Sequence, residues 1–397
     1  MSHHVLISVD ELWLKGSNRP TYYRLIHNHI QDVLRLYHGQ KTEWTNQTQR
    51  IYLTSESPFL DDTLTALSRV PGVHSVSKTF YALKTVEDIT KVAFENLGEL
   101  KELTLFKVET ARNDKSFPMS SMELSREIGH ELLERSSLLK VDVKNPELVI
   151  HLRIQPEGAY VSSSKIKGVG GLPMGSSGHG ITLLSGGFDS PVASYLMSRR
   201  GLSQTLIFFH AYPFVGDEVK TKIIQLAKRL ALYNKKCELM IVPFGEIQKA
   251  IAETSKVDYR TLFFRRAMID MANLIAENKK AKVIVTGDSL SQVSSQTIDN
   301  IASIDHASMR SIFRPLIGMS KREIMSIASE IGTHDISIQP HDDACSLFAP
   351  ENPVLKGDSR YSKLFFSDNQ FDQLYRTAIE HAECFTFNVK GQELASK

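Results

Sequence analysis

A strand–glycine–helix turn in the middle of the chain constrains the fold more than any other stretch. The apolar run Gly180–Leu184 is typical of a buried strand, and Ser185, Gly186 and Gly187 follow it directly. Asp189 then heads a helix start, as an N-cap candidate followed two residues later by proline. Adjacent glycines let the backbone turn tightly, so several N–H groups meet at the positive end of that helix. The stretch predicts a phosphate-binding turn, with an ordinary strand–turn–helix corner as the alternative.

Strands and helices alternate after this turn. Strand candidates at 182–185, 205–210, 238–243 and 282–286 alternate with helix candidates at 191–200, 217–232, 258–278 and 321–331. Such alternation predicts a parallel, doubly wound α/β sheet, in which ligands lie at the carboxyl ends of the strands. The glycine turn, His210 and the pair Gly287 and Asp288 would converge there.

The residues before the turn show a different pattern. Strand candidates lie at 5–9, 50–53, 75–83, 106–110 and 148–152, and helix candidates at 21–37, 63–68, 86–97 and 121–133. A glycine-rich stretch, 168–178, follows as a linker or an ordered loop. We therefore expect three blocks, over residues 1–58, 59–168 and 176–397.

Composition excludes several classes of protein. No stretch approaches the roughly 20 apolar residues of a membrane span, and the N-terminus lacks the basic and apolar regions of a signal peptide. The three cysteines are far apart, which argues against a disulfide scaffold and against a zinc site of paired cysteines. We expect a cytoplasmic protein. Since the net charge is only +2, any nucleic-acid footprint must be a local patch.

Several strings together resemble a known family. Residues 185–190, Ser-Gly-Gly-Phe-Asp-Ser, resemble the SGGxDS signature of PP-loop ATP pyrophosphatases and lack the spacing of a Walker motif. Residues 12–19, 170–175, 286–297 and 314–319 add matches in the right order, and the chain is identified as a member of the tRNA 4-thiouridine synthetase (ThiI) family. The resemblance covers nearly the whole chain. It implies an α+β ferredoxin-like domain (1–58), a THUMP RNA-binding domain (59–168) and a doubly wound PP-loop ATP pyrophosphatase domain (176–397).

The resemblance also implies an ATP site with Mg²⁺. The positions carried over for ATP are Leu183, Leu184, Ser185, Gly186, Gly187, Ser190, Phe208, Phe209, Arg265, Gly287 and Gln296. Phe208 stands where the family commonly has histidine. One of the pair Arg265 and Arg266 is expected to face the phosphates. Asp189 is expected to hold Mg²⁺ and to be catalytic, with a purely structural N-cap as the alternative.

Cys345 is the expected catalytic cysteine, because the family carries a reactive cysteine at this place. The second cysteine that often precedes it is Ala344 here. Cys237 and Cys384 are expected to be core residues.

By resemblance, RNA would contact the THUMP block and its flank. The residues expected to bind it are Lys107, Arg112, Lys115, Lys165 and Lys167. The alternative is that these side chains form an ordinary solvated face.

The implied activity is ATP-dependent synthesis of 4-thiouridine at position 8 of tRNA. The uridine C4 oxygen would be adenylated, and a persulfide on Cys345, loaded by a cysteine desulfurase, would deliver sulfur. The resemblance extends to sulfur delivery for thiamine thiazole synthesis. Longer members carry a C-terminal rhodanese domain, for which the roughly 50 residues after Cys345 are too few. A homodimer is one option for the assembly, and no membrane partner is expected.

Two other interpretations remain open at this point. The first is a different PP-loop enzyme, which adenylates a small carboxylate or another base. The second is a tRNA-binding protein with an inactive nucleotide fold. ATP–pyrophosphate exchange without tRNA would favour the first. The intact residues 185–190 argue against the second.

Overall fold

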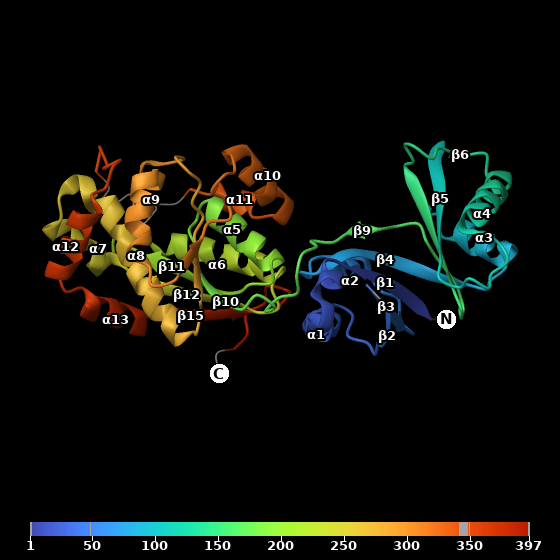
Figure 1. Cartoon of the computed structure of the whole chain (residues 1–397), viewed down its shortest axis with the longest axis horizontal. Helices are drawn as coiled ribbons and strands as arrows, with labels where there is room; N and C mark the ends of the chain where they lie inside the picture. Colours follow the sequence, from blue (N-terminus) through green and yellow to red (C-terminus); the bar gives the residue numbers. More distant parts are fainter. Residues whose placement is uncertain (1, 48, 341–347, 349, 396–397) are drawn as a thin grey trace. The chain divides into compact units, whose positions relative to one another are not determined.

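A computed structural model of the chain describes residues 2–47, 49–340, 348 and 350–395, without the side chains of residues 13 and 14. The chain divides into two compact units, one formed by residues 1–20 and 30–171 and the other by residues 21–29 and 172–397. Each unit has its own β-sheet (Figure 1). Among the described residues, we find no helix with the length and apolar character needed to cross a membrane.

A nine-stranded sheet runs through the first unit, in the order β2-β3-β1-β4-β8-β7-β5-β6 with β9 beside β4. Its elements are β1 (His3–Val9), a 3-10 helix (Leu12–Asn18), β2 (Glu43–Gln47), β3 (Arg50–Ser55), α2 (Asp61–Ser68), β4 (Val73–Ala82), α3 (Val86–Glu95), β5 (Thr104–Arg112), α4 (Ser121–Arg135), β6 (Leu139–Val141), β7 (Leu148–Gln155), β8 (Gly158–Ser162) and β9 (Ile166–Lys167). Helix α1 (Arg19–Tyr37) has residues in both units.

Strand β4 joins the two halves of this sheet. It pairs antiparallel with β1 over most of its length and with β8 at its end, from Phe80 to Ala82. The halves therefore share one sheet. Helices α3 and α4 lie side by side near β5 (Figure 1), and they enclose a core around Phe106 and Ile150. Helix α4 begins at Ser121 because Ser120 and Glu123 form a reciprocal capping box.

The glycine-rich stretch is an ordered loop where it leaves the first unit. The amide of Gly168 donates to the His74 carbonyl at 2.8 Å, and the Gly72 amide donates to the Gly170 carbonyl at 2.9 Å. The Gly171 amide donates to the carboxylate of Asp10 at 2.9 Å. Of the two expectations for this stretch, the ordered loop is confirmed.

A six-stranded sheet forms the second unit, in the order β14-β13-β10-β11-β12-β15. Its elements are β10 (His179–Leu183), α5 (Asp189–Arg199), β11 (Ser203–His210), α6 (Asp217–Ala231), β12 (Cys237–Pro243), α7 (Gly245–Thr254), a 3-10 turn (Val257–Tyr259), α8 (Arg260–Asn278), β13 (Val283–Val285), a 3-10 turn (Ser294–Gln296), α9 (Ile298–Asp305), β14 (Ser311–Phe313), α10 (Lys321–Ile331), α11 (His334–Ser337), α12 (Ser359–Asp368), α13 (Asp372–Glu380) and β15 (Glu383–Phe387). All the pairings are parallel except that of β15 with β12. The expected α/β fold is thus confirmed, with an added antiparallel edge strand.

The buried face of α8 explains how this sheet is covered. Phe263, Phe264 and Ala267 on α8 are fully buried and belong to one core with Ile181 and Ile207 of the central strands. Because this apolar packing holds α8 across the strands, the residues at its start face the carboxyl ends of β10 and β11.

Candidate active site

A cavity of about 450 Å³ lies at the carboxyl ends of β10, β11 and β13 in the second unit. It is bounded by the glycine turn, by the start of α8 and by the segment that follows β13. The sequence-predicted residues that line it are Leu183, Leu184, Ser185, Asp189, Ser190, Phe208, Phe209, Arg265, Gly287 and Gln296. Gly186 and Gly187 lie in the turn beside it and are not among its lining residues.

The side chain of Ser190 holds the turn closed. The Ser185 amide donates to Ser190 Oγ at 2.7 Å, and Ser190 Oγ lies 3.3 Å from the Ser185 carbonyl oxygen. The amides of Gly186 and Gly187 have no acceptor among the described residues. Ser190 therefore acts on the shape of the turn, while the two glycine amides are left for a ligand.

Two glycines around the turn have opposite surroundings. A Cβ added to Gly287 would lie 2.7 Å from the Ser190 backbone nitrogen and 2.9 Å from the carbonyl carbon of Asp189, so only glycine permits this approach of the β13 loop to α5. A Cβ on Gly187 would meet only Ser185 Oγ, at 3.9 Å. No described atom requires glycine at 187, so the backbone is open on the side where a Cβ would lie.

Asp189 is the first residue of α5 and is not its N-cap. The N-cap position belongs to Phe188, and no side chain caps this helix. The capping interpretation of Asp189 was therefore wrong, because its carboxylate is bound elsewhere. It accepts from Lys321 Nζ at 2.8 and 3.0 Å and from Gln292 Nε2 at 2.9 Å.

The surroundings of Asp189 fit one mode of magnesium binding and not another. Among the described residues, no group of three or more His, Cys, Asp or Glu side chains could form a protein cage for a metal. Mg²⁺ is commonly held by one or two carboxylates together with substrate phosphates. A single carboxylate at the cavity wall, already balanced by a lysine, fits that second arrangement.

Buried Asp288 organises the opposite wall. It binds the guanidinium groups of Arg265 and Arg314, the latter at 3.1 Å, and the hydroxyl of Thr286 at 2.7 Å. Burial by itself would raise the pKa of Asp288, but the two arginines and the hydroxyl hold that pKa below its usual value. Arg265 also donates to the Ser295 carbonyl at 2.8 Å. Its guanidinium is thus braced at the cavity before any ligand arrives.

The sequence predicted Asp288, after Gly287 at the end of a strand, at this edge of the sheet, and it lines the cavity. The sequence did not mark Arg314, Gln292 or Lys321 as site residues. The pairing of Asp189 with Lys321 joins residues 132 positions apart, which no local pattern predicts.

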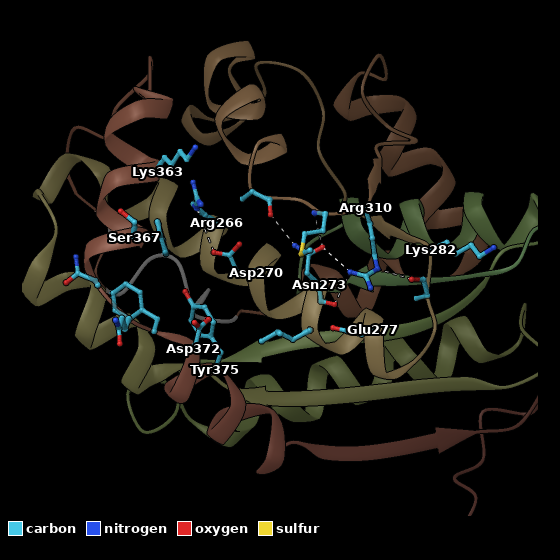
Figure 2. A pocket seen from close by; sticks show the side chains of 18 residues that line it. Arg266, Asp270, Asn273, Glu277, Lys282, Arg310, Lys363, Ser367, Asp372 and Tyr375 are labelled. Carbon is cyan, nitrogen blue, oxygen red and sulfur yellow. Dashed lines mark hydrogen bonds and ion pairs between the residues drawn. The ribbon is translucent and has the colours of Figure 1, made fainter.

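Arg266 does not belong to this cavity. It lines a separate hollow of about 1160 Å³ on another side of α8, together with Asp270 and Tyr375 (Figure 2). Its Nε lies 3.8 Å from an Asp270 oxygen, and its guanidinium stacks over Phe366 at 4.6 Å from the ring centre. Of the arginine pair, only Arg265 lines the candidate site.

The aromatic residues of β11 form an apolar part of the wall. Phe208 and Phe209 are buried, and both line the cavity. His210, which was expected to converge there, is buried with Nε2 3.2 Å from the Gly216 carbonyl oxygen and is not among the lining residues. His210 thus ends β11 at the expected edge of the sheet, but its ring contacts the next loop and does not line the cavity.

The cysteines differ in position. Cys237 is buried at the start of β12, where burial raises the pKa of its thiol to about 12, so the core assignment is confirmed. Cys384 is exposed on β15, and its core assignment was wrong because β15 is an edge strand. Cys345 and Ala344 lie outside the described residues. The segment before them is anchored, since Lys222 Nζ donates to the carbonyls of Ser337 and Gln339 at 2.9 and 2.7 Å.

The expected RNA-binding residues have several structural roles in the first unit. Arg112 donates to the carbonyls of Phe117 and Met119, at 2.8 and 2.6 Å, so its guanidinium braces a loop. Lys107 is paired with Glu109 at 2.6 Å. Lys115, Lys165 and Lys167 are exposed.

Fold and site together define a class of protein, an ATP-pyrophosphatase-like α/β domain joined to a THUMP domain. Family models support this division. The THUMP domain model matches residues 84–164, the ThiI ferredoxin-like domain model matches residues 4–77, and the model described as thiamine biosynthesis protein (ThiI) matches residues 175–363.

The chain belongs to the tRNA sulfurtransferase (ThiI) family. It is 37% identical over 383 residues to a probable tRNA sulfurtransferase of Caldanaerobacter subterraneus, covering 96% of this chain and 98% of that one. The corresponding protein of Acetivibrio thermocellus is also 37% identical, over 391 residues, or 97% of this chain and 99% of that one. A crystal structure of a 4-thiouridine synthetase–RNA complex with bound ATP aligns with a TM-score of 0.86 at 29% identity, covering 97% of this chain and 100% of that chain.

Proposed function

We propose that this protein uses ATP to convert uridine 8 of tRNA into 4-thiouridine. The supporting observation is the cavity at the strand ends, which gathers Asp189, Arg265 and Gly287 beside a glycine turn. The full-length similarity to tRNA sulfurtransferases and to a 4-thiouridine synthetase crystallised with RNA and ATP supports the same substrates.

The first chemical step is adenylation of the base. The uridine C4 oxygen attacks the α-phosphorus of ATP, and pyrophosphate leaves. The amides of Gly186 and Gly187, which have no acceptor among the described residues, face the leaving group together with the positive end of α5 and stabilise its growing charge. Asp189 would hold Mg²⁺ together with the phosphates, and the ion would neutralise phosphate charge there. Lys321, released from Asp189, is then available to a phosphate oxygen.

The second step replaces the activated oxygen with sulfur. Cys345 would carry a persulfide supplied by a cysteine desulfurase. Its terminal sulfur attacks C4, the C–O bond breaks, and AMP leaves with the electron pair. A second thiol then attacks Sγ of Cys345, the S–S bond to the base breaks and 4-thiouridine leaves; the new disulfide between Cys345 and that thiol is reduced by an external dithiol before the next turnover.

Nucleoside analysis tests the proposal. Purified protein is incubated with an unmodified tRNA transcript, ATP and a persulfide donor, and we expect one pyrophosphate for each 4-thiouridine formed at position 8. Absence of 4-thiouridine under these conditions contradicts the proposal, and ATP–pyrophosphate exchange without tRNA would point to another PP-loop enzyme.

The name of the matching family model suggests a second role in thiamine thiazole synthesis. Thiamine dependence of a deletion strain would test this role.

A further inference from the structure

A small polar groove lies on the first unit's sheet where β4 passes from β1 to β8. Its volume is about 40 Å³. Alternation along the strands places Ser8 and Ser77 on the face opposite to Ile7 and Val76, which are core residues. Strands β1, β4, β7 and β8 contribute the lining, together with Lys165, which lies between β8 and β9. The lining residues are Leu6, Ser8, Ser75, Ser77, Thr79, His151, Arg153, Tyr160, Ser162 and Lys165.

Hydroxyl groups form the floor of the groove. Ser75, Ser77 and Thr79 follow one another at alternate positions of β4, and all three are buried. Thr79 is 3% exposed, and its Oγ1 has no hydrogen-bond partner among the described residues. A buried hydroxyl normally has a partner. A ligand in the groove would supply one.

Arg153 adds an unbalanced positive charge. Its Nη1 is buried and has no hydrogen-bond partner among the described residues. Burial, reinforced by the nearby charge of Arg50, lowers the pKa of Arg153. Guanidinium groups that lose water in this way are usually paired with an anion. Because no lining residue is acidic, the groove does not supply that anion itself.

Glu109, which contacts the lining residue His151, is already paired. Glu109 accepts from Lys107 at 2.6 Å and lies 3.3 Å from His151 Nδ1. Lys165 is exposed at the opening of the groove. The groove therefore combines a lysine, a guanidinium and several hydroxyl donors around a small space.

We propose that this groove binds one phosphate group of the RNA backbone. Phosphate oxygens accept the hydrogen bonds of guanidinium, ammonium and hydroxyl groups in this arrangement. The space admits phosphate oxygens and excludes a nucleoside, so the contact positions the RNA without reading its sequence. The inference rests on the proposed function, since it takes tRNA as the partner. Arg153 and Thr79, which the sequence did not mark for RNA binding, join Lys165 in one subsite.

Binding of a tRNA transcript to the full-length protein tests this subsite. In Arg153→Gln, we expect the dissociation constant to rise about tenfold, because a hydrogen bond to a charged group is lost. The plot of log affinity against log salt should become shallower by roughly 0.7 to 0.9, the value for one phosphate contact. Arg35→Gln is the control, since the Arg35 side chain is 72% exposed and already paired with Asp32; its affinity and salt slope should equal those of the wild type.

Thr79→Val is a second variant, chosen because it should leave the fold intact. It removes the unpartnered hydroxyl at nearly constant volume, so the melting temperature without RNA should stay the same or rise, while tRNA affinity falls. Unchanged tRNA affinity in both Arg153→Gln and Thr79→Val would overturn the subsite even if the wild type thiolates tRNA. If inorganic phosphate raises the melting temperature of the wild type but not of Arg153→Gln, and tRNA affinity is equal in both, the groove binds free phosphate and the RNA assignment is wrong. A wild type that neither binds nor thiolates tRNA would instead contradict the proposed function.

Discussion

At the scale of single residues, the candidate site depends on charges that are paired before any ligand binds. Asp189 is balanced by Lys321, and Asp288 by Arg265 and Arg314. Asp288 is almost fully buried, so removing one of its partners would leave an uncompensated charge. Asp189 is partly exposed, so its pairing contributes little to stability and is free to exchange.

Asp189→Ala should abolish tRNA-dependent pyrophosphate release while leaving the fold intact. The ion pair that it removes joins side chains that are 22% and 43% exposed, and such pairs are worth about 1 kcal/mol or less. Pyrophosphate release and thermal melting measure the two effects. Asp335→Ala, which alters a carboxylate that is 95% exposed, is the control and should behave as the wild type. Normal turnover in Asp189→Ala would show that Asp189 has no role in the reaction.

Asp270 gives a prediction about pH and stability. Burial raises its pKa to about 7, with Arg266 acting in the opposite direction. The folded protein thus holds a proton that the unfolded chain loses near pH 4, so this carboxyl group destabilises the fold as pH rises from about 4 to 7. Asp270→Asn should therefore be more stable than the wild type at pH 8, by on the order of a few kcal/mol, and should lose this advantage at pH 4. Urea unfolding at both pH values measures the difference; an equal effect at both would refute the shifted pKa.

At the scale of elements, the glycine turn works because α5 and the loop after β13 approach each other closely. Gly287 permits the approach, and the side chain of Ser190 closes the turn. The geometry of the amides is therefore set by packing between elements that lie far apart in the sequence.

Gly287→Ala and Gly187→Ala form a matched pair. The first places a methyl group against backbone atoms, so we expect a loss of stability of about 1–3 kcal/mol as well as a loss of activity. The second adds a methyl group whose nearest described neighbour is Ser185 Oγ at 3.9 Å, so stability should be unchanged while ATP binding weakens. Calorimetric titration with ATP and thermal melting separate the two results. Unaltered ATP affinity in Gly187→Ala would show that phosphate does not lie beside this glycine.

At the scale of the whole molecule, the proposed reaction has two halves that one substitution should separate. Cys345→Ser cannot carry a persulfide, but Asp189, Arg265 and the glycine turn remain. We expect tRNA-stimulated pyrophosphate release to persist for a first turnover while 4-thiouridine disappears. High concentrations of free sulfide should partly restore the product, because the activated C4 needs only a sulfur nucleophile.

The other two cysteines are the controls for that experiment. Cys237→Ser places a hydroxyl in the core and should lower stability, whereas exposed Cys384→Ser should have little effect. Loss of 4-thiouridine in Cys384→Ser would identify it as the thiol that resolves the persulfide. Normal 4-thiouridine formation by Cys345→Ser would mean that sulfur reaches uridine by another route.

The sequence by itself determined the elements with strong local signals. Hydrophobic periodicity located helices such as α6 and α10 and the strands that bury an apolar face, because that pattern requires no knowledge of distant residues. It did not locate β2, whose residues are exposed or half-buried, or the edge strand β15, which pairs with β12 far away in the sequence. The Ser-Gly-Gly turn and the family strings located the candidate site.

Only the tertiary structure decided which charges meet. It paired Asp189 with Lys321 and turned Arg112 toward backbone carbonyls, although both had been interpreted from their neighbours in sequence. It placed Cys384 on a sheet edge and gave Arg153 a buried, unpartnered nitrogen in a groove made by four strands. Charge pairing and burial depend on chain segments brought together by folding, whereas periodicity and turn chemistry are local. The sequence therefore predicts elements and motifs well, and the partners of polar side chains poorly.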